Sequence, residues 1–235
     1  MRRAVTIVIP VHNEADFMPA ALARLFAELE GVDADFEIIV AENGSSDETG
    51  SVAERIAETE PRMRVLRLPE PNYGAAMRAG FEAASGEWVA NFDIDYFSAD
   101  FLRAGLALAD AADIVLGSKR APGAEDRRSP LRRLGTFGFN VLLKLLFRSS
   151  VSDTHGMKLI RETIVREFTP RVISDLDLFD TELVIRAERA GARIREIPAK
   201  CEELRATRSS FLSRVPRTLE GLWRIRKALR RESRT

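Results

Sequence analysis

Two aspartates, Asp93 and Asp95, stand two residues apart directly after the apolar segment 87–92. If that segment is a strand, residues i and i+2 at its end point the same way, roughly 7 Å apart, and both carboxylates face one pocket. Carboxylate oxygens are ligands that Mg²⁺ and Mn²⁺ prefer, and these cations often take their remaining ligands from water or phosphate. The pair therefore predicts a divalent-metal site that a bound diphosphate would complete.

A diphosphate beside these aspartates needs the cation for electrostatic reasons. Two like charges about 4 Å apart repel by roughly 4 kcal/mol at an effective dielectric constant near 20. Because an Asp-x-Asp triplet also occurs by chance, its weight depends on the elements that position it.

Apolar, β-branched segments alternate with amphipathic segments along the first half of the chain. The predicted strands cover residues 4–9, 36–41, 63–68, 87–92 and 113–117, and the predicted helices cover residues 16–30, 51–60, 75–84 and 100–109. This order is typical of βαβ units and predicts an α/β fold with a doubly wound, mostly parallel sheet flanked by helices. Ligands bind beyond the carboxyl ends of such strands, so a site is expected where the polar segments that follow them meet.

The second half of the chain is richer in predicted helices, which cover residues 130–147, 160–168, 179–190 and 211–229. A short strand is expected at 193–197, and the polar segment 121–129 is either a linker or a mobile lid. The segments 134–147 and 211–231 combine apolar faces with basic residues, which predicts amphipathic helices at a membrane interface. For 134–147, a place in the core or at a dimer interface stays open.

Composition and charge narrow the class of protein. With 235 residues, 45% of them hydrophobic and 31% charged, the chain is expected to be globular with a sizeable core. Its single cysteine, Cys201, excludes an internal disulfide and fits a reducing compartment, and neither a signal peptide nor a membrane span is predicted. Residues 205–235 have a net charge of +8 and the residues before them −8. This basic tail favours an anionic partner, a membrane rather than nucleic acid, unless it is only a solvated helix.

Four motifs of the first half resemble glycosyltransferase family 2, whose members have the GT-A fold: IPVHNE (9–14), IIVAENGSSDET (38–49), NYGAAMRAG (72–80) and ASGEWVANFDID (84–95). Four later segments are similar to the dolichyl-phosphate mannose synthase-like branch of that family: 117–123, 132–140, 152–161 and 179–198. The resemblance implies a GT-A catalytic domain at 1–210, with a nucleotide-sugar half at about 1–120 and an acceptor half at about 121–210. Residues 211–235 would follow it as a basic amphipathic C-terminal helix.

The resemblance also implies roles for individual residues. Donor-binding roles fall on Pro10, His12 and Glu14 at the nucleoside, Glu42 and Asn43 at the base and ribose, Gly74, and Asp93. Metal binding falls on Asp93 and Asp95, and the catalytic group comprises Asp95, Lys119, Arg120, Arg132 and Lys158. Acceptor-binding roles fall on Arg133, Asn140, Arg205, Arg208 and Ser210. Gly74 is expected to let a ligand approach the backbone closely, unless it is only a turn glycine.

The sequence departs from the family pattern at several of these positions. His12 stands where the branch usually has tyrosine, and Glu42-Asn43 stands where the family has two aspartates. Lys158 replaces an arginine, and the lysine expected a few residues after Arg205 is missing. These departures leave the base and the sugar of the donor open.

The acceptor decides how the nucleophile is activated. A phosphate monoester is largely dianionic near neutral pH, because its second pKa is about 6, and it needs a cationic cradle but no general base. A hydroxyl acceptor needs a base within about 3 Å, for which Asp180 and Glu182 are the candidates, unless both only stabilise the start of a helix.

The expected function is metal-dependent, inverting transfer of mannose or glucose from GDP-mannose or UDP-glucose to a polyprenyl phosphate, with Mg²⁺ or Mn²⁺ as cofactor. The enzyme would be cytoplasmic and peripheral on the inner face of the membrane, with a homodimer or a membrane-protein partner left open. Two alternatives remain: a family 2 enzyme acting on a non-lipid hydroxyl, and an inactive nucleotide-sugar-binding module.

Overall fold

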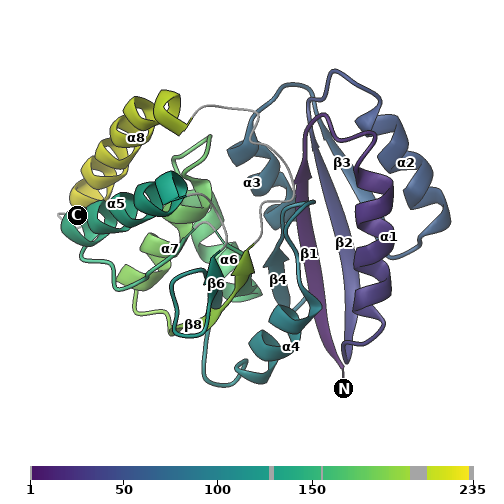
Figure 1. Cartoon of the computed structure of the whole chain (residues 1–235), viewed down its shortest axis with the longest axis horizontal. Coiled ribbons are helices and arrows are strands. Elements are labelled where there is room, and N and C mark those ends of the chain that lie inside the picture. The colour runs from purple at the N-terminus through teal and green to yellow at the C-terminus, as the bar shows by residue number, and fades with distance from the viewer. Residues whose placement is uncertain (1, 127–129, 155, 202–210, 233–235) are drawn as a thin grey trace.

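The computed structural model describes residues 2–126, 130–154, 156–201 and 211–232, and a seven-stranded sheet lies at its centre (Figure 1). Its strands are β1 (Arg3–Val11), β2 (Ala34–Asn43), β3 (Met63–Leu68), β4 (Trp88–Asn91), β5 (Ile114–Ser118), β7 (Lys158–Arg161) and β8 (Ile194–Pro198). They are arranged in the order β3-β2-β1-β4-β7-β5-β8. Strand β7 is antiparallel to both of its neighbours, and the other neighbouring pairs are parallel. The sheet is therefore mixed and mostly parallel.

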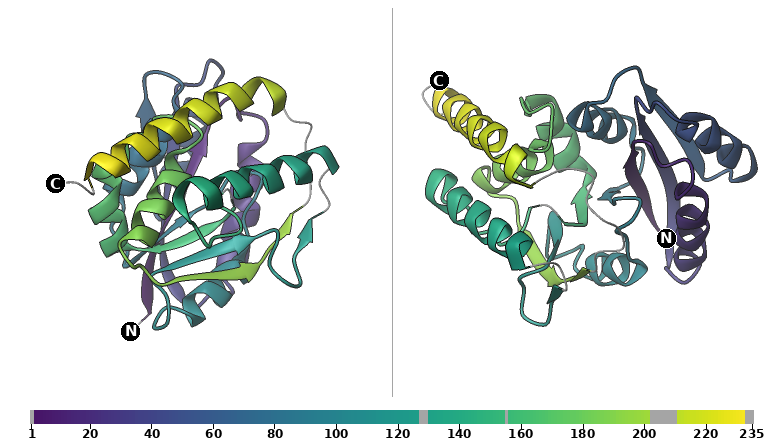
Figure 2. Two further views of the ribbon diagram at one scale, coloured as in Figure 1. Left: turned by 90° about the vertical axis from the view of Figure 1, so that its left-hand side faces the viewer. Right: turned by 45° about the horizontal axis from the view of Figure 1, so that its top comes forward.

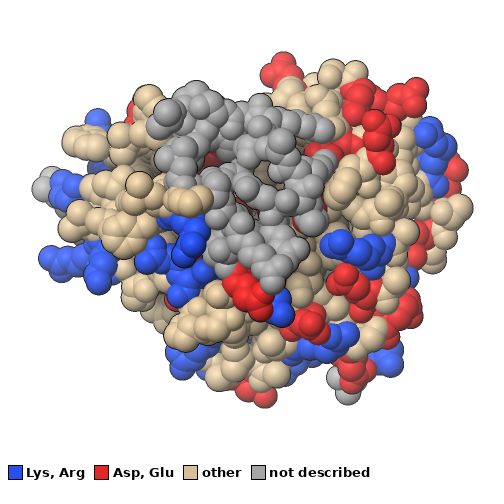
Figure 3. Space-filling view, viewed as in Figure 1, with Lys and Arg blue, Asp and Glu red and all other residues tan. Residues whose placement is uncertain are grey.

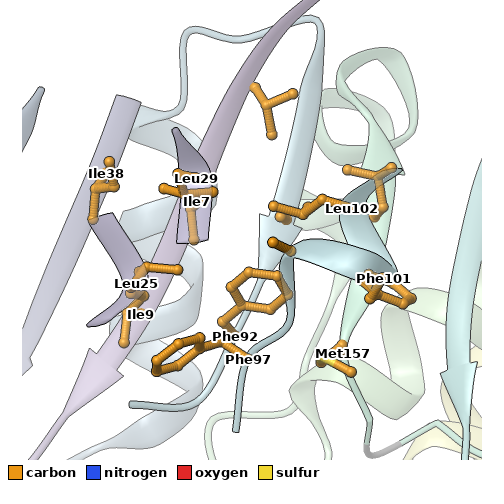
Figure 4. Close-up of a cluster of buried hydrophobic side chains, with 14 of the residues drawn as sticks. Ile7, Ile9, Leu25, Leu29, Ile38, Phe92, Phe97, Phe101, Leu102 and Met157 are labelled. Carbon is orange, nitrogen blue, oxygen red and sulfur yellow. The ribbon is translucent and has the colours of Figure 1, made fainter. Parts of the chain in front are cut away.

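Helices cover both faces of this sheet, because its strands are apolar on both sides. One face packs against α1 (Met18–Leu29), α2 (Thr49–Thr59) and α4 (Ala99–Ala107). The other packs against α3 (Tyr73–Ala83), α6 (Glu162–Phe168) and α7 (Phe179–Arg189). Strand β1 shows the alternation directly: Ile7 and Ile9 belong to the first core, drawn in Figure 4, and Val8 belongs to the second.

The predicted α/β order of the first half is confirmed. Each strand and helix expected between residues 4 and 117 is present, and its ends lie within two residues of the predicted ones. The continuous β-branched segments were decisive, since a strand buried on both faces needs apolar residues without interruption.

The helix predicted over residues 160–168 is wrong in its first part. Residues Lys158–Arg161 form β7, which is inserted antiparallel between β4 and β5, and helix α6 begins only at Glu162. A run of four residues cannot be distinguished from a helical turn by its periodicity, so only the pairing partners decide it. The segment expected to be a linker or lid contains β6 (Glu125–Asp126), which pairs with β9 (Lys200–Cys201).

A separate apolar cluster joins α7 to two long helices, α5 (Pro130–Phe147) and α8 (Phe211–Glu232). Its buried members come from all three helices and the turn before α7: Leu143, Phe147, Leu178, Ile185, Leu222, Ile225 and Leu229. Both views in Figure 2 show α5 and α8 side by side on the outside of the molecule. One face of each helix is therefore buried, while the opposite face carries exposed apolar side chains.

We predict that replacing Gly74, near the start of α3, with a residue that has a Cβ atom destabilises the protein. A Cβ atom at this position would lie 2.4 Å from the backbone carbon of Asp175 and 2.6 Å from its oxygen. Overpacking of this kind typically destabilises by about 1–3 kcal/mol. We expect Gly74→Ala to lower the free energy of unfolding by that amount in urea titrations.

Gly138→Ala is the matched control, because a Cβ atom at Gly138 in α5 would meet nothing within 4 Å. Alanine there should leave stability unchanged or raise it by up to about 1 kcal/mol. Equal stability of the two variants would contradict this account of Gly74.

Candidate active site

The loops that follow β1 and β2 hold each other in place at the carboxyl edge of the sheet. Asn13 has a positive φ of 55°, its Oδ1 accepts a hydrogen bond of 2.8 Å from the Ser46 amide, and its own amide donates to Ser45 Oγ over 2.9 Å. His12 Nδ1 lies 2.9 Å from the Asn43 carbonyl oxygen. Asn13 was not predicted as a site residue, although asparagine is one of the few residues that tolerate this backbone conformation.

Glu42 and Asn43 are buried, and the structure occupies one acceptor oxygen of each within the chain. Glu42 Oε1 accepts from the Ser45 amide at 2.6 Å, and Asn43 Oδ1 accepts from the Asn72 amide at 2.6 Å. Asn72 in turn caps α3, since its Oδ1 accepts from the Ala75 amide at 3.0 Å. Their predicted roles at the base and ribose stay predictions, and their observed role is to fix the loops around the site.

Three further residues predicted for the donor site, Pro10, Glu14 and Gly74, also lie along this edge of the sheet. Pro10 lies in β1 beside Ala41 of β2, and the Glu14 amide donates to Thr49 Oγ1 at 2.7 Å. Gly74 lies against the backbone of Asp175, and its amide donates to the Asp175 carbonyl at 3.1 Å. The chain itself thus approaches Gly74 closely, and the approach of a ligand stays a prediction.

The Asp93–Asp95 triplet forms a tight turn, not the strand end that was predicted. The Asp93 amide donates to the Tyr96 carbonyl at 3.2 Å, and the Tyr96 amide donates back to the Asp93 carbonyl at 2.9 Å. The side chain of Ile94, within this turn, is buried in the first core. The alternation argument for the two carboxylates is thus wrong, although both remain at the carboxyl end of β4.

Lys158 is buried and forms hydrogen bonds with residues near this turn. The residue is 1% exposed, and its ammonium group donates to three oxygens: Asn91 Oδ1 at 3.1 Å, Gly156 O at 2.9 Å and Asp180 Oδ2 at 3.1 Å. The same Asp180 oxygen accepts from the Tyr73 hydroxyl at 2.8 Å. An ammonium group has three protons, so these three contacts saturate Lys158, which therefore acts as an internal counter-ion.

Burial raises the pKa of Asp93 to about 6, and neighbouring charges modify that effect. Lys158 and Lys119 lower the pKa, whereas the negative charges of Asp95 and Asp180 raise it. Three carboxylates thus share this region with two ammonium groups. Such a surplus of negative charge fits a divalent cation.

The described residues offer a metal here two carboxylates. Asp93 and Asp95 are the residues that would hold it, and the described residues include no group of three or more His, Cys, Asp or Glu side chains suited to a metal ion. A diphosphate would supply further oxygens, as Mg²⁺ and Mn²⁺ commonly require.

Lys119 and Arg120, which follow β5, form the cationic side of the site. Lys119 is buried, with its Nζ 3.4 Å from Asp153 Oδ2 and 5.3 Å from the centre of the Tyr96 ring. Arg120 is exposed, and its guanidinium carbon lies 5.0 Å from the centre of the Phe137 ring on α5. The structure thus brings the predicted pair of cations next to the Asp93–Tyr96 turn on one side and to α5 on the other.

The two predicted base candidates differ in their surroundings. Glu182 is fully buried, and its carboxylate accepts hydrogen bonds from the amides of Ile173 and Ser174, from Ser174 Oγ and from Arg186 Nε. It therefore anchors the segment before α7. Asp180, in contrast, acts electrostatically on Asp93.

The remaining predictions concern the acceptor side. Asn140 Nδ2 donates to the Ser152 carbonyl, which ties α5 to the segment before β7, and Arg133 is exposed on α5. The side chain of Arg132 and the residues Arg205, Arg208 and Ser210 lie outside the described part of the chain.

The Asp93 carboxyl group predicts a pH-dependent metal affinity. A proton competes with the cation below the pKa of about 6, so Mn²⁺ affinity should fall about tenfold per pH unit below pH 6 and level off above pH 7. Electron paramagnetic resonance titration of Mn²⁺ measures this directly. Asp93→Asn should bind Mn²⁺ weakly at every pH, and an identical pH profile in that variant would refute the assignment.

The raised pKa of Asp93 also predicts how the stability of the metal-free protein depends on pH. The folded state holds the Asp93 proton more tightly than the unfolded chain, whose value is near 3.8. The Asp93 contribution to the free energy of unfolding should therefore fall as the pH rises from about 4 to about 6. Saturating Mn²⁺ should reverse that loss above pH 6.

Comparison with known proteins agrees with this geometry. The sequence profile of glycosyl transferase family 2 matches residues 6–169. The glycosyltransferase AglD of Haloferax volcanii is 31% identical over 210 residues, which are 84% of this chain but only 33% of that protein. The dolichyl-phosphate beta-glucosyltransferase ALG5C of Trichomonas vaginalis is 26% identical over 247 residues, covering 94% of this chain and 73% of that protein.

Solved structures share the fold. The mannosyltransferase PcManGT of Pyrobaculum calidifontis, in complex with GDP-Man and Mn²⁺, superposes with a TM-score of 0.67 at 23% identity over 98% of this chain and 65% of that one. Glucosyl-3-phosphoglycerate synthase of Mycobacterium tuberculosis, in complex with Mn²⁺, UDP and phosphoglyceric acid, gives 0.68 at 20% identity over 95% of this chain and 78% of that one. With its sequence profile, its sheet order and these neighbours, the chain belongs to glycosyltransferase family 2 and has the GT-A fold.

Proposed function

We propose that this enzyme transfers mannose or glucose from GDP-mannose or UDP-glucose to the phosphate group of a polyprenyl phosphate at a membrane surface. The observation that carries the proposal is the contact of Arg120 with Phe137. It joins the cationic side of the Asp93–Tyr96 turn to an exposed apolar face of α5. A substrate with a phosphate head and a hydrocarbon tail matches that combination.

The apolar face of α5 is unusually exposed for a helix of a globular protein. Leu134, Phe137, Val141 and Leu145 follow one another at intervals of three and four residues, which places them on one side of the helix. Leu134 is 65% and Leu145 71% exposed. These side chains lie opposite the buried residues Leu143 and Phe147 of the same helix. We name them, together with the corresponding residues of α8, the apolar surface.

Helix α8 extends the apolar surface. Val215, Leu219 and Trp223 are exposed and follow one another at intervals of four residues, and Trp223 is 65% exposed. Figure 3 shows Lys and Arg side chains gathered on the left, where α5 and α8 lie, and most of the visible acidic side chains on the right. Each basic residue near an anionic membrane contributes up to about 1 kcal/mol, so this charge distribution supports binding to such a membrane. Within the described part of the chain, no helix is long and apolar enough to cross the bilayer.

The proposed reaction is a single displacement at the anomeric carbon. The acceptor phosphate is already dianionic near neutral pH and attacks without a general base. Lys119 and Arg120, which lie beside the Asp93–Tyr96 turn and α5, would stabilise negative charge on the acceptor phosphate and the departing nucleotide diphosphate. A divalent cation held by Asp93 and Asp95 would neutralise diphosphate charge when bound. A single displacement inverts the configuration of the sugar.

A hydroxyl acceptor is the second candidate. It is favoured by one observation, which is that the buried carboxylate of Asp180 lies close enough to Asp93 to raise its pKa. Under this reading Asp180 would take the proton of the attacking hydroxyl, and neither the apolar surface nor a lipid would be needed.

A panel of donors tests the proposed reaction. Protein with Mn²⁺ and a short polyprenyl phosphate in detergent receives labelled GDP-mannose, UDP-glucose or UDP-N-acetylglucosamine separately. We expect one donor to pass its label to the organic phase, and Asp95→Asn to reduce that rate by about 100-fold or more, because the bound diphosphate loses its counter-charge. Donor binding without transfer to lipid would contradict the proposal and favour the inactive nucleotide-sugar-binding module. Transfer to a water-soluble alcohol would instead favour the hydroxyl acceptor.

Vesicle sedimentation tests the apolar surface. Vesicles of phosphatidylcholine that contain about 30% phosphatidylserine, and therefore have a negative surface potential, should retain the protein. The double substitution Leu145→Glu and Trp223→Glu should weaken this binding by about tenfold or more, since it places two carboxylates in the interface.

Arg55→Glu on α2 serves as the charge control, because Arg55 is exposed and lies outside α5 and α8. It should bind vesicles like the wild type. A membrane role for this surface would be contradicted if the double variant bound vesicles as well as the wild type. It would also be contradicted if the wild type did not bind vesicles but formed a dimer that the double variant does not form.

A further inference from the structure

We infer that Asp180 recognises a hydroxyl group of the donor sugar. The Oδ1 atom of Asp180 would accept a hydrogen bond from that hydroxyl group. The side chain is 5% exposed. Its Oδ2 atom is used twice, by the Tyr73 hydroxyl and by the Lys158 ammonium group. Its Oδ1 atom is buried and has no hydrogen-bond partner among the described residues. The inference rests on the proposed nucleotide-sugar site and names the group that this site reads.

A buried acceptor without a donor is costly to the protein. An unsatisfied buried polar group costs about 1–3 kcal/mol, and more when it is charged. Such an atom in a native structure needs an explanation, and a hydrogen-bond donor supplied by a ligand is the one that we adopt for Asp180. Asp180 thus has one oxygen that fixes the carboxylate and one that remains for a ligand.

The carboxylate is held rigidly in advance. Tyr73 begins α3, whose cap Asn72 is bound to Asn43 at the end of β2. Lys158 begins β7 and is also bound to Asn91 at the end of β4. Two strands and a helix therefore fix Asp180 before any ligand binds, which strengthens a hydrogen bond to a ligand at little entropic cost.

The chemistry of the neighbours selects a hydroxyl group. Lys158, the ion-pair partner of Asp180, also bonds to Asn91, two residues before Asp93, so the Asp180 carboxylate lies near the two aspartates of the Asp93–Tyr96 turn. A phosphate oxygen would be repelled there, whereas a sugar hydroxyl donates a proton to the carboxylate. A diphosphate bound at Asp93 and Asp95 would carry its sugar into this neighbourhood, since the sugar is attached directly to the diphosphate.

Deoxy donors test the inference without an acceptor. Calorimetry in the presence of Mn²⁺ compares the donor that the enzyme accepts with its 2-, 3-, 4- and 6-deoxy analogues. In the wild type, loss of the recognised hydroxyl should raise the dissociation constant roughly 10- to 100-fold, because a hydrogen bond to a charged group is lost. Asp180→Asn should bind the parent donor more weakly and show little further loss with that one analogue, while the other analogues keep their effects.

Two further variants make the result specific. Tyr73→Phe keeps both charges of the Lys158–Asp180 pair and should reduce the penalty for the same analogue several-fold, so the test does not depend on Asp180→Asn alone. Asp177→Asn is the matched control, since Asp177 precedes α7 and pairs with Arg217 on the surface. All its deoxy penalties should equal those of the wild type.

The outcomes separate this inference from the proposed function. If every deoxy penalty is the same in Asp180→Asn as in the wild type, Asp180 does not read the sugar and the inference fails alone. If no nucleotide sugar binds to the wild type, both fail. A general base would instead lower kcat with a hydroxyl acceptor and leave the deoxy pattern in calorimetry unchanged, which also overturns the inference.

Discussion

The ion pair between Lys158 and Asp180 is the interaction on which the rest of the site depends. Its two buried charges lie 3.1 Å apart, and the ammonium group also bonds to Asn91 and Gly156. One side chain thereby joins β4, the segment before β7 and α7. Without it, the carboxylates of Asp93, Asp95 and Asp180 would share a partly buried region with less compensating charge. Breaking one partner of a buried pair usually costs about 3–5 kcal/mol.

The sequence made the fold predictable wherever local patterns decide the structure. The apolar segment around Ile7–Ile9 predicted a strand buried on both faces, and the polar residues after β4 predicted a site at the carboxyl edge of the sheet. Strand β7 was missed because four residues carry no usable periodicity and its position depends on β4 and β5. The turn at Asp93 was missed because the backbone hydrogen bonds between Asp93 and Tyr96 leave no mark in the pattern of apolar residues.

Individual side-chain roles were harder to predict, because their partners are remote in sequence. Lys158 was expected to belong to the catalytic group, yet its three protons are all bound within the protein. Asp180 and Glu182 looked equivalent as helix-start acids, but Glu182 holds the segment before α7 while Asp180 keeps one oxygen unpaired. The contacts of Asp180 span 22 positions to Lys158 and 107 to Tyr73, which no local pattern encodes.

A double-mutant cycle on Lys158 and Asp180 tests the central claim most directly. Urea unfolding would compare Lys158→Met, Asp180→Asn and the double variant with the wild type. If the pair neutralises the site, Lys158→Met should lower the free energy of unfolding by about 3–5 kcal/mol, and the double variant should be more stable than Lys158→Met. Strictly additive losses would show that the two charges do not depend on each other and would contradict the account.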